Sequence, residues 1–130
     1  MTQQPGDSNI FRITDPETYR CQVWQYDSKL SRLSLRVYRA LEREQAAFSV
    51  MFTDVGYWEG PMTWIGVDFR VASHDECITL MLETGLIGQA ILQFPGAYAS
   101  ITEVARLFIV ETKHQPIRLI ASIGTMMPSA

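Results

Sequence analysis

The sequence is poor in the residue types on which metalloproteins and many enzymes depend. Its 130 residues include two cysteines and two histidines. Two cysteines do not make a disulfide framework, and they are most simply explained as two buried thiols. A closed zinc site needs four ligands, and no second pair with zinc-type spacing accompanies His74 and Cys77. The sequence therefore predicts no metal site and no bound cofactor.

Motifs that bind phosphate or activate a nucleophile are also missing. There is no glycine-rich phosphate loop, no dinucleotide fingerprint and no Gly-x-Ser-x-Gly turn. Acids around one predicted turn could do acid–base chemistry if they clustered, but solvated turn residues are commoner. We predict no catalytic residue. A small enzyme or ligand-binding protein is kept as the alternative, with a pocket at Asp54/Glu59/Asp68 or at His74/Cys77.

Long apolar runs are absent as well. None approaches the roughly 18–20 residues of a membrane span, and the N-terminal residues lack the basic and apolar regions of a secretory signal. We therefore expect a soluble, cytoplasmic protein without a membrane partner. The mean hydropathy of +0.01 is high for a small soluble monomer. An apolar surface covered by a homo-oligomer would explain it.

Charge is sparse, at 19% of residues, and the net charge of −3 argues against nucleic acid as a partner. The charges are also segregated, because residues 29–43 are basic and residues 54–83 are acidic. Either the two segments pair within the fold, or each faces a partner. A nucleic-acid-associated protein remains a further alternative through one row of arginines: Arg32, Arg36, Arg39 and Arg43.

Residues 29–46 fit two secondary structures. As a helix, they place the arginines on one stripe and leucines with Val37 on the other. As a strand, Leu33, Leu35 and Val37 alternate with polar residues, and Leu35 avoids the charged side. We favour a strand through Arg39, then a polar turn, and leave the helix open.

Elsewhere, alternating apolar residues and turn signals predict strands. These strands cover about 9–13, 19–25, 48–53, 65–71, 105–112 and 116–123. Ser73 and Glu76 form a capping box ahead of a helix over 74–84, and Ser100 and Glu103 form a second box that predicts one helical turn. The expected fold is α+β and strand-rich: a mostly antiparallel sheet, small sandwich or half-barrel of six or seven strands with one short helix. Residues 10–124 form the expected domain, between a disordered tail at 1–9 and a loose tail at 125–130.

One segment, residues 57–64, gathers aromatic side chains beside a Gly-Pro turn. Aromatic and methionine side chains are favoured at binding surfaces, although they also cap cores. We predict partner binding by Tyr57, Trp58, Glu59, Met62 and Trp64. The leading hypothesis is a non-enzymatic protein-interaction domain of accessory, adaptor or toxin-neutralising type, which binds a protein partner or itself.

Overall fold

The computed structural model describes residues 3–128. Along the chain, the strands are β1 (Arg20–Asp27), β2 (Arg32–Tyr38), β3 (Phe48–Thr53), β4 (Tyr57–Glu59), β5 (Thr63–Ile65), β6 (Arg70–Val71), β7 (Arg106–Val110), β8 (Ile117–Ala121) and β9 (Ile123–Pro128). The α-helices are α1 (His74–Glu83) and α2 (Ala97–Val104), and the short 3-10 helices are η1 (Pro16–Thr18) and η2 (Gln89–Gln93).

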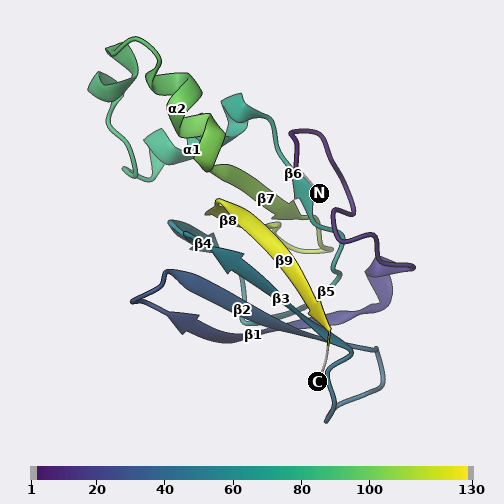
Figure 1. The fold of residues 1–130 in the computed structure, drawn as a ribbon. Helices are drawn as coiled ribbons and strands as arrows, with labels where there is room; N and C mark the ends of the chain where they lie inside the picture. Colours follow the sequence, from purple (N-terminus) through teal and green to yellow (C-terminus); the bar gives the residue numbers. More distant parts are fainter. Residues whose placement is uncertain (1–2, 129–130) are drawn as a thin grey trace.

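These strands form two antiparallel sheets that face each other (Figure 1). Sheet A has the order β5-β1-β2-β3-β9, and sheet B has the order β4-β8-β7-β6. The α+β, strand-rich class is confirmed, with more strands than expected and a second α-helix. The extra strands are short: β4, β5 and β6 span two or three residues each.

The main core lies between the sheets. Phe52 of β3 meets Phe69 and Phe108 at ring-centroid distances of 5.2 and 5.1 Å, and all three rings are fully buried. On the other face of sheet B, helix α1 buries a second cluster against β7 and β8. Strands β7 and β8 are therefore covered on both faces, which explains the unbroken apolar run over 107–110 in β7 and why Arg118 alone interrupts the apolar residues of β8. Within residues 3–128, no helix is both long and apolar enough to cross a membrane.

The ambiguous segment 29–46 contains a strand, as favoured. Leu33, Leu35 and Val37 point into the core from β2, and β2 pairs with β1 and β3. Arg39 and Arg43 lie beyond the strand, in the β2–β3 loop. A helix would have exposed Leu35, whereas the strand buries it completely.

The predicted strand over 65–71 is wrong as one element. Gly66 has φ = +124°, which L-residues with a side chain rarely adopt, and the chain turns there from sheet A towards sheet B. The turn also removes Ile65 from the expected buried face, since Ile65 is exposed while Val67 and Phe69 are fully buried. Only Ile65 and residues 70–71 of the predicted run lie in strands, β5 and β6, and residues 66–69 connect the two sheets without forming a strand.

The N-terminal segment is neither a strand at 9–13 nor a disordered tail at 3–9. Asn9 and Arg12 have positive φ, and the Asn9 side chain exchanges hydrogen bonds with the backbone of Ile13. Nearer the terminus, the Gly6 amide donates to the Val71 carbonyl (2.8 Å), and the Val71 amide donates to Asp7 (2.7 Å). This segment thus extends the β6 edge of sheet B. The first two residues lie outside the described part.

The C-terminal prediction was also wrong, because residues 123–128 form β9 and pair with β3 over its full length. Residues 129–130 lie outside the described part. The second capping box was misplaced, because α2 begins after Gly96 and Ser100 and Glu103 lie inside the helix. The first box predicted the start of α1 correctly: Ser73 is the N-cap, and its hydroxyl accepts a hydrogen bond from the Glu76 amide at 3.1 Å.

Candidate interaction surfaces

The aromatic turn at residues 57–64 folds mostly onto the core. Trp64 is buried, and its Nε1 donates to the carbonyl oxygen of Gly66 at 2.8 Å. Trp58 is half-buried beside it, with the two ring centroids 5.6 Å apart. Met62 is 63% exposed and projects from the turn. Of the five residues predicted to bind a partner, the structure therefore presents one prominently to solvent.

A polar cluster accounts for the two remaining residues of that prediction. Arg118 donates to both carboxylate oxygens of Glu59, at 2.9 and 2.6 Å, and the Tyr57 hydroxyl donates to Glu59 at 2.6 Å. The Arg118 hydrogen bonds hold the pKa of Glu59 below its usual value. The bond to Glu59 raises the pKa of Tyr57. Glu59 is thus an ionised acceptor that ties β4 to β8.

The three acids considered for a pocket are bonded separately. Asp54 accepts from the Ser122 hydroxyl at 2.8 Å, and Asp68 accepts from the Asn9 amide at 2.8 Å, while Glu59 binds Arg118. In the part of the chain that the structure describes, no three potential metal ligands gather. The acids therefore stabilise local structure in three different places.

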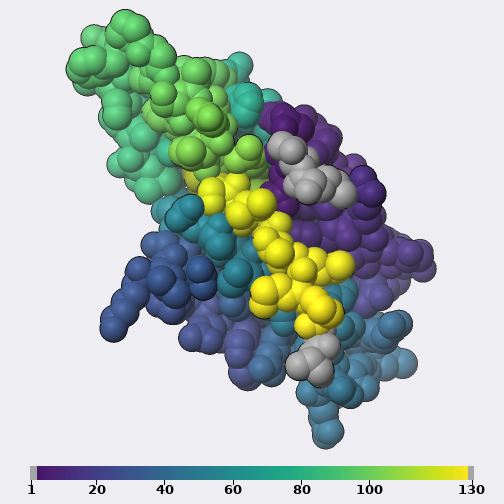
Figure 2. All heavy atoms as spheres, viewed as in Figure 1, coloured from purple at the N-terminus to yellow at the C-terminus, as the bar shows by residue number. Residues whose placement is uncertain are grey.

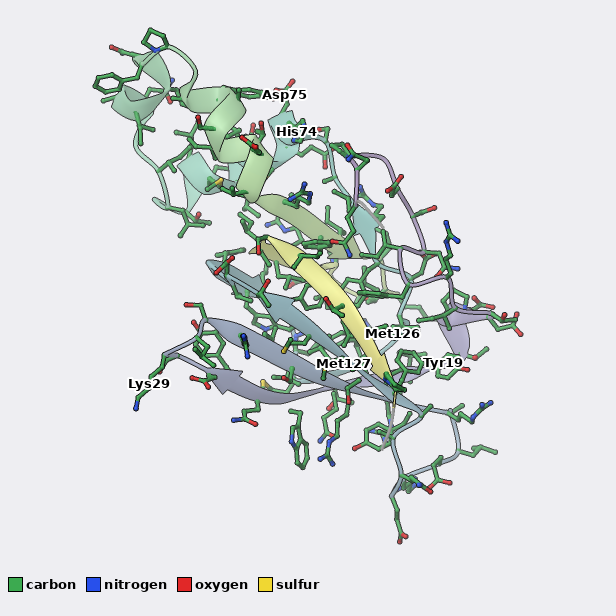
Figure 3. All side chains as sticks on the ribbon, viewed as in Figure 1. Tyr19, Lys29, His74, Asp75, Met126 and Met127 are labelled. Atoms are coloured by element: carbon green, nitrogen blue, oxygen red, sulfur yellow. The ribbon has the colours of Figure 1, made fainter. Side chains whose placement is uncertain are left out.

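His74 and Cys77 share helix α1 but differ in environment. Figure 3 shows His74 and Asp75 at the first turn of the helix. Cys77 is buried, and burial raises its thiol pKa to about 11. Cys21 is also a free, buried thiol, and burial raises its pKa to about 12. A thiolate is the reactive form, so neither cysteine is activated for nucleophilic attack at neutral pH.

Two shallow hollows flank the β2–β3 loop and share Arg39. The larger, of about 410 Å³, is lined by residues of the 14–19 segment and by Arg39 and Ala40. The smaller, of about 210 Å³, is lined by residues 39–47. Neither is lined by the three acids, by His74 or by Cys77. The pocket alternative gains no support from these hollows.

Residues 84–104, which we call the helical projection, extend beyond the sheets (Figures 1 and 2). Residues 84–102 contain no charged residue. The segment exposes large apolar side chains: Leu86, Ile91, Phe94, Tyr98 and Val104. Phe94 is the most exposed of them, at 68%. Tyr98 anchors the projection, since its hydroxyl donates to Asp75 of α1 at 2.6 Å. The charge-free run was visible in the sequence, but its exposure was not.

A second surface is the outward face of sheet A, which we call the outer sheet face. Because Leu33, Leu35 and Val37 point inward, Arg32 and Arg36 of β2 point outward. The residues that join them on this face from neighbouring strands are Gln22, Trp24, Met51 and Met127. A bulge in β1 releases Trp24 from regular pairing, and its ring lies 3.3 Å from the guanidinium carbon of Arg36. The sequence located the arginines but not this stacked partner.

The basic and acidic segments do not neutralise each other. The two salt bridges found within residues 3–128 join Arg70 to Glu111 and Arg118 to Glu59. Neither involves a residue of the basic segment 29–43. The basic side chains of sheet A therefore remain available for an outside partner.

Comparison of the chain with protein-family models, with curated proteins and with solved structures gave no match.

Proposed function

We propose that this chain is a non-enzymatic, cytoplasmic protein-interaction domain, and that the helical projection binds a second copy of the chain. One observation carries the proposal: a charge-free apolar segment stands exposed at one end of the molecule. Exposed apolar area costs roughly 25 cal/mol per Å², which burial in an interface recovers. The two buried, free thiols fit a reducing compartment.

The lack of charge favours a second copy as the occupant. In a two-fold interface, each patch meets an identical patch, so a charged residue near the centre meets its own like charge. The cores of such interfaces are depleted in charged residues and enriched in aromatic ones. The projection meets this requirement, because Phe94 and Tyr98 lie within its uncharged run.

Light scattering coupled to size exclusion, over a range of protein concentrations, tests the proposal. The wild-type mass is expected to rise from monomer to dimer, while Ile91→Glu and Phe94→Glu remain monomeric because each buries a charge in the interface. Leu41→Glu is the matched control, since Leu41 is 96% exposed but lies in the β2–β3 loop. A wild-type chain that stays monomeric at every concentration would overturn the proposed self-association.

A further inference from the structure

The outer sheet face is basic but not purely polar. Arg32 and Arg36 stand two rows apart on β2, and Arg20 of β1 lies at one end of the same face. The acid among the outward-pointing residues is Asp27, which lies opposite Arg32 at the end of the β1–β2 pairing. Its carboxylate is already an acceptor for the amides of the following turn, at Lys29 and Leu30. Within residues 3–128, no salt bridge joins Arg20, Arg32 or Arg36 to a carboxylate.

Two of these guanidinium groups are held in place by aromatic rings. Arg36 lies over Trp24 at 3.3 Å, and Arg20 lies over Tyr38 at 4.4 Å. Stacking uses the flat face of the guanidinium and leaves its N–H groups free around the rim. An arginine fixed in this way loses less side-chain entropy when a carboxylate binds it in bidentate fashion. The face is therefore preorganised for anionic groups.

Aliphatic side chains adjoin the arginines. Met51 of β3 pairs with Ser34, between Arg32 and Arg36, and Met127 lies across β3 from Arg36. Ile65 is exposed beyond Arg20 at the β5 edge. Figure 3 shows Met127 near the C-terminal end of β9. A ligand for this surface must combine negative charge with apolar side chains.

We propose that the outer sheet face is a docking site for an acidic polypeptide segment that carries aliphatic side chains. Charge complementarity supports the acidic character, and the methionines support the aliphatic character. This surface lies on the opposite side of the sandwich from the helical projection (Figure 1). The two proposals therefore depend on different residues and are tested by different variants.

The same geometry favours polypeptide over single-stranded nucleic acid. Binding of bases requires aromatic rings with free faces. Here Arg36 occupies one face of the Trp24 ring and Tyr38 is buried beneath Arg20, so at most the other face of Trp24 is open to a base.

Fluorescence anisotropy of a labelled 12-residue peptide, with eight glutamates and four regularly spaced leucines, tests the proposal. The full-length wild-type chain is expected to bind it with an affinity that falls as salt rises. The Arg32→Gln/Arg36→Gln variant should bind about tenfold more weakly. The matched control, Arg12→Gln/Lys113→Gln, makes the same change in net charge at exposed positions away from this face and should bind like the wild type. Circular dichroism checks that both variants remain folded.

Two further probes separate the partner classes. A peptide with glutamine in place of glutamate should not bind, because it lacks the carboxylates. An oligo(dT) of the same length should bind more weakly than the acidic peptide. Equal or tighter binding of oligo(dT) would overturn the proposal in favour of nucleic acid. Failure of the acidic peptide to bind, or equal binding to both double variants, would overturn it outright.

Discussion

The side-chain amide of Gln3 makes both hydrogen bonds that a neighbouring strand would offer to Gly124. Its Nε2 donates to the Gly124 carbonyl oxygen at 2.6 Å, and its Oε1 accepts from the Gly124 amide at 3.2 Å. Strand β9 is the edge of sheet A, and exposed edges invite pairing with other chains. Further along the same edge, Pro128 has no N–H to offer. The N-terminal segment thus blocks an edge that would otherwise be open.

Replacing Gln3 should therefore weaken the fold. In Gln3→Ala, two partly buried backbone groups lose their partner, and the free energy of unfolding should fall by about 1–2 kcal/mol. Urea denaturation measures this, and light scattering should show more aggregation on warming. The neighbouring variant Gln4→Ala is the control, because Gln4 is exposed and bonds Asp7 through its main-chain amide. Equal stability of the two variants would contradict the role of Gln3.

Gly124 should not tolerate a side chain. A Cβ there would lie 2.6 Å from the Phe52 ring and 3.1 Å from Phe11, both part of the main core. Gly124→Ala should lower the free energy of unfolding by about 1–3 kcal/mol, the usual cost of overpacking. Gly88→Ala is the matched control, with nothing within 4 Å of the added Cβ and φ = −98°. Chemical denaturation measures the stability of both variants. A denaturation midpoint for Gly124→Ala equal to that of the wild type would refute the close packing.

The two capping boxes should respond oppositely to alanine. Ser73→Ala removes the acceptor for the Glu76 amide and should cost about 1 kcal/mol in stability. Ser100→Ala lies inside α2 and exposed, so it should be neutral or slightly stabilising because alanine is the better helix former. Thermal denaturation, monitored by circular dichroism, measures the stability of both variants. A loss at Ser100 as large as that at Ser73 would show that α2 begins later than described.

The Glu59–Arg118 pair should contribute to stability in a pH-dependent way. Glu59→Gln keeps the shape and should lower stability at neutral pH by about 0.5–1 kcal/mol, as expected for a pair whose side chains are about one third exposed. Because the folded-state pKa of Glu59 is lowered, the contribution is complete above its ordinary pKa of 4.5. It is lost as pH falls through the lowered folded-state pKa.

Urea denaturation from pH 7 down to pH 3 measures the difference between wild type and Glu59→Gln. Glu111→Gln is the control at pH 7, because its single 3.2 Å bond to Arg70 is more exposed and should contribute little. A difference that persists unchanged at pH 3 would mean that the ion pair is not its cause.

Local sequence patterns were sufficient to predict an element when a single face of that element packs against a single core. The alternation over 48–53 and the capping box at Ser73 predicted β3 and α1 closely. They were insufficient where the chain changes sheets. The turn at Gly66 interrupts one alternating run, and both tails are held by residues distant in the sequence: Gln3 bonds Gly124, and β9 pairs with β3.

The interaction surfaces also combine features that the sequence determines with features that only the fold determines. The sequence alone determined that the chain has a basic row, a charge-free apolar run and few groups suited to catalysis, because these are properties of composition and order. Only the tertiary structure decided which of these groups reach the surface. It turned Trp58 and Trp64 towards the core, left Phe94 exposed on a projection, and placed Arg36 against Trp24. Burial and stacking depend on contacts between distant segments, and those contacts exist only once the two sheets have packed.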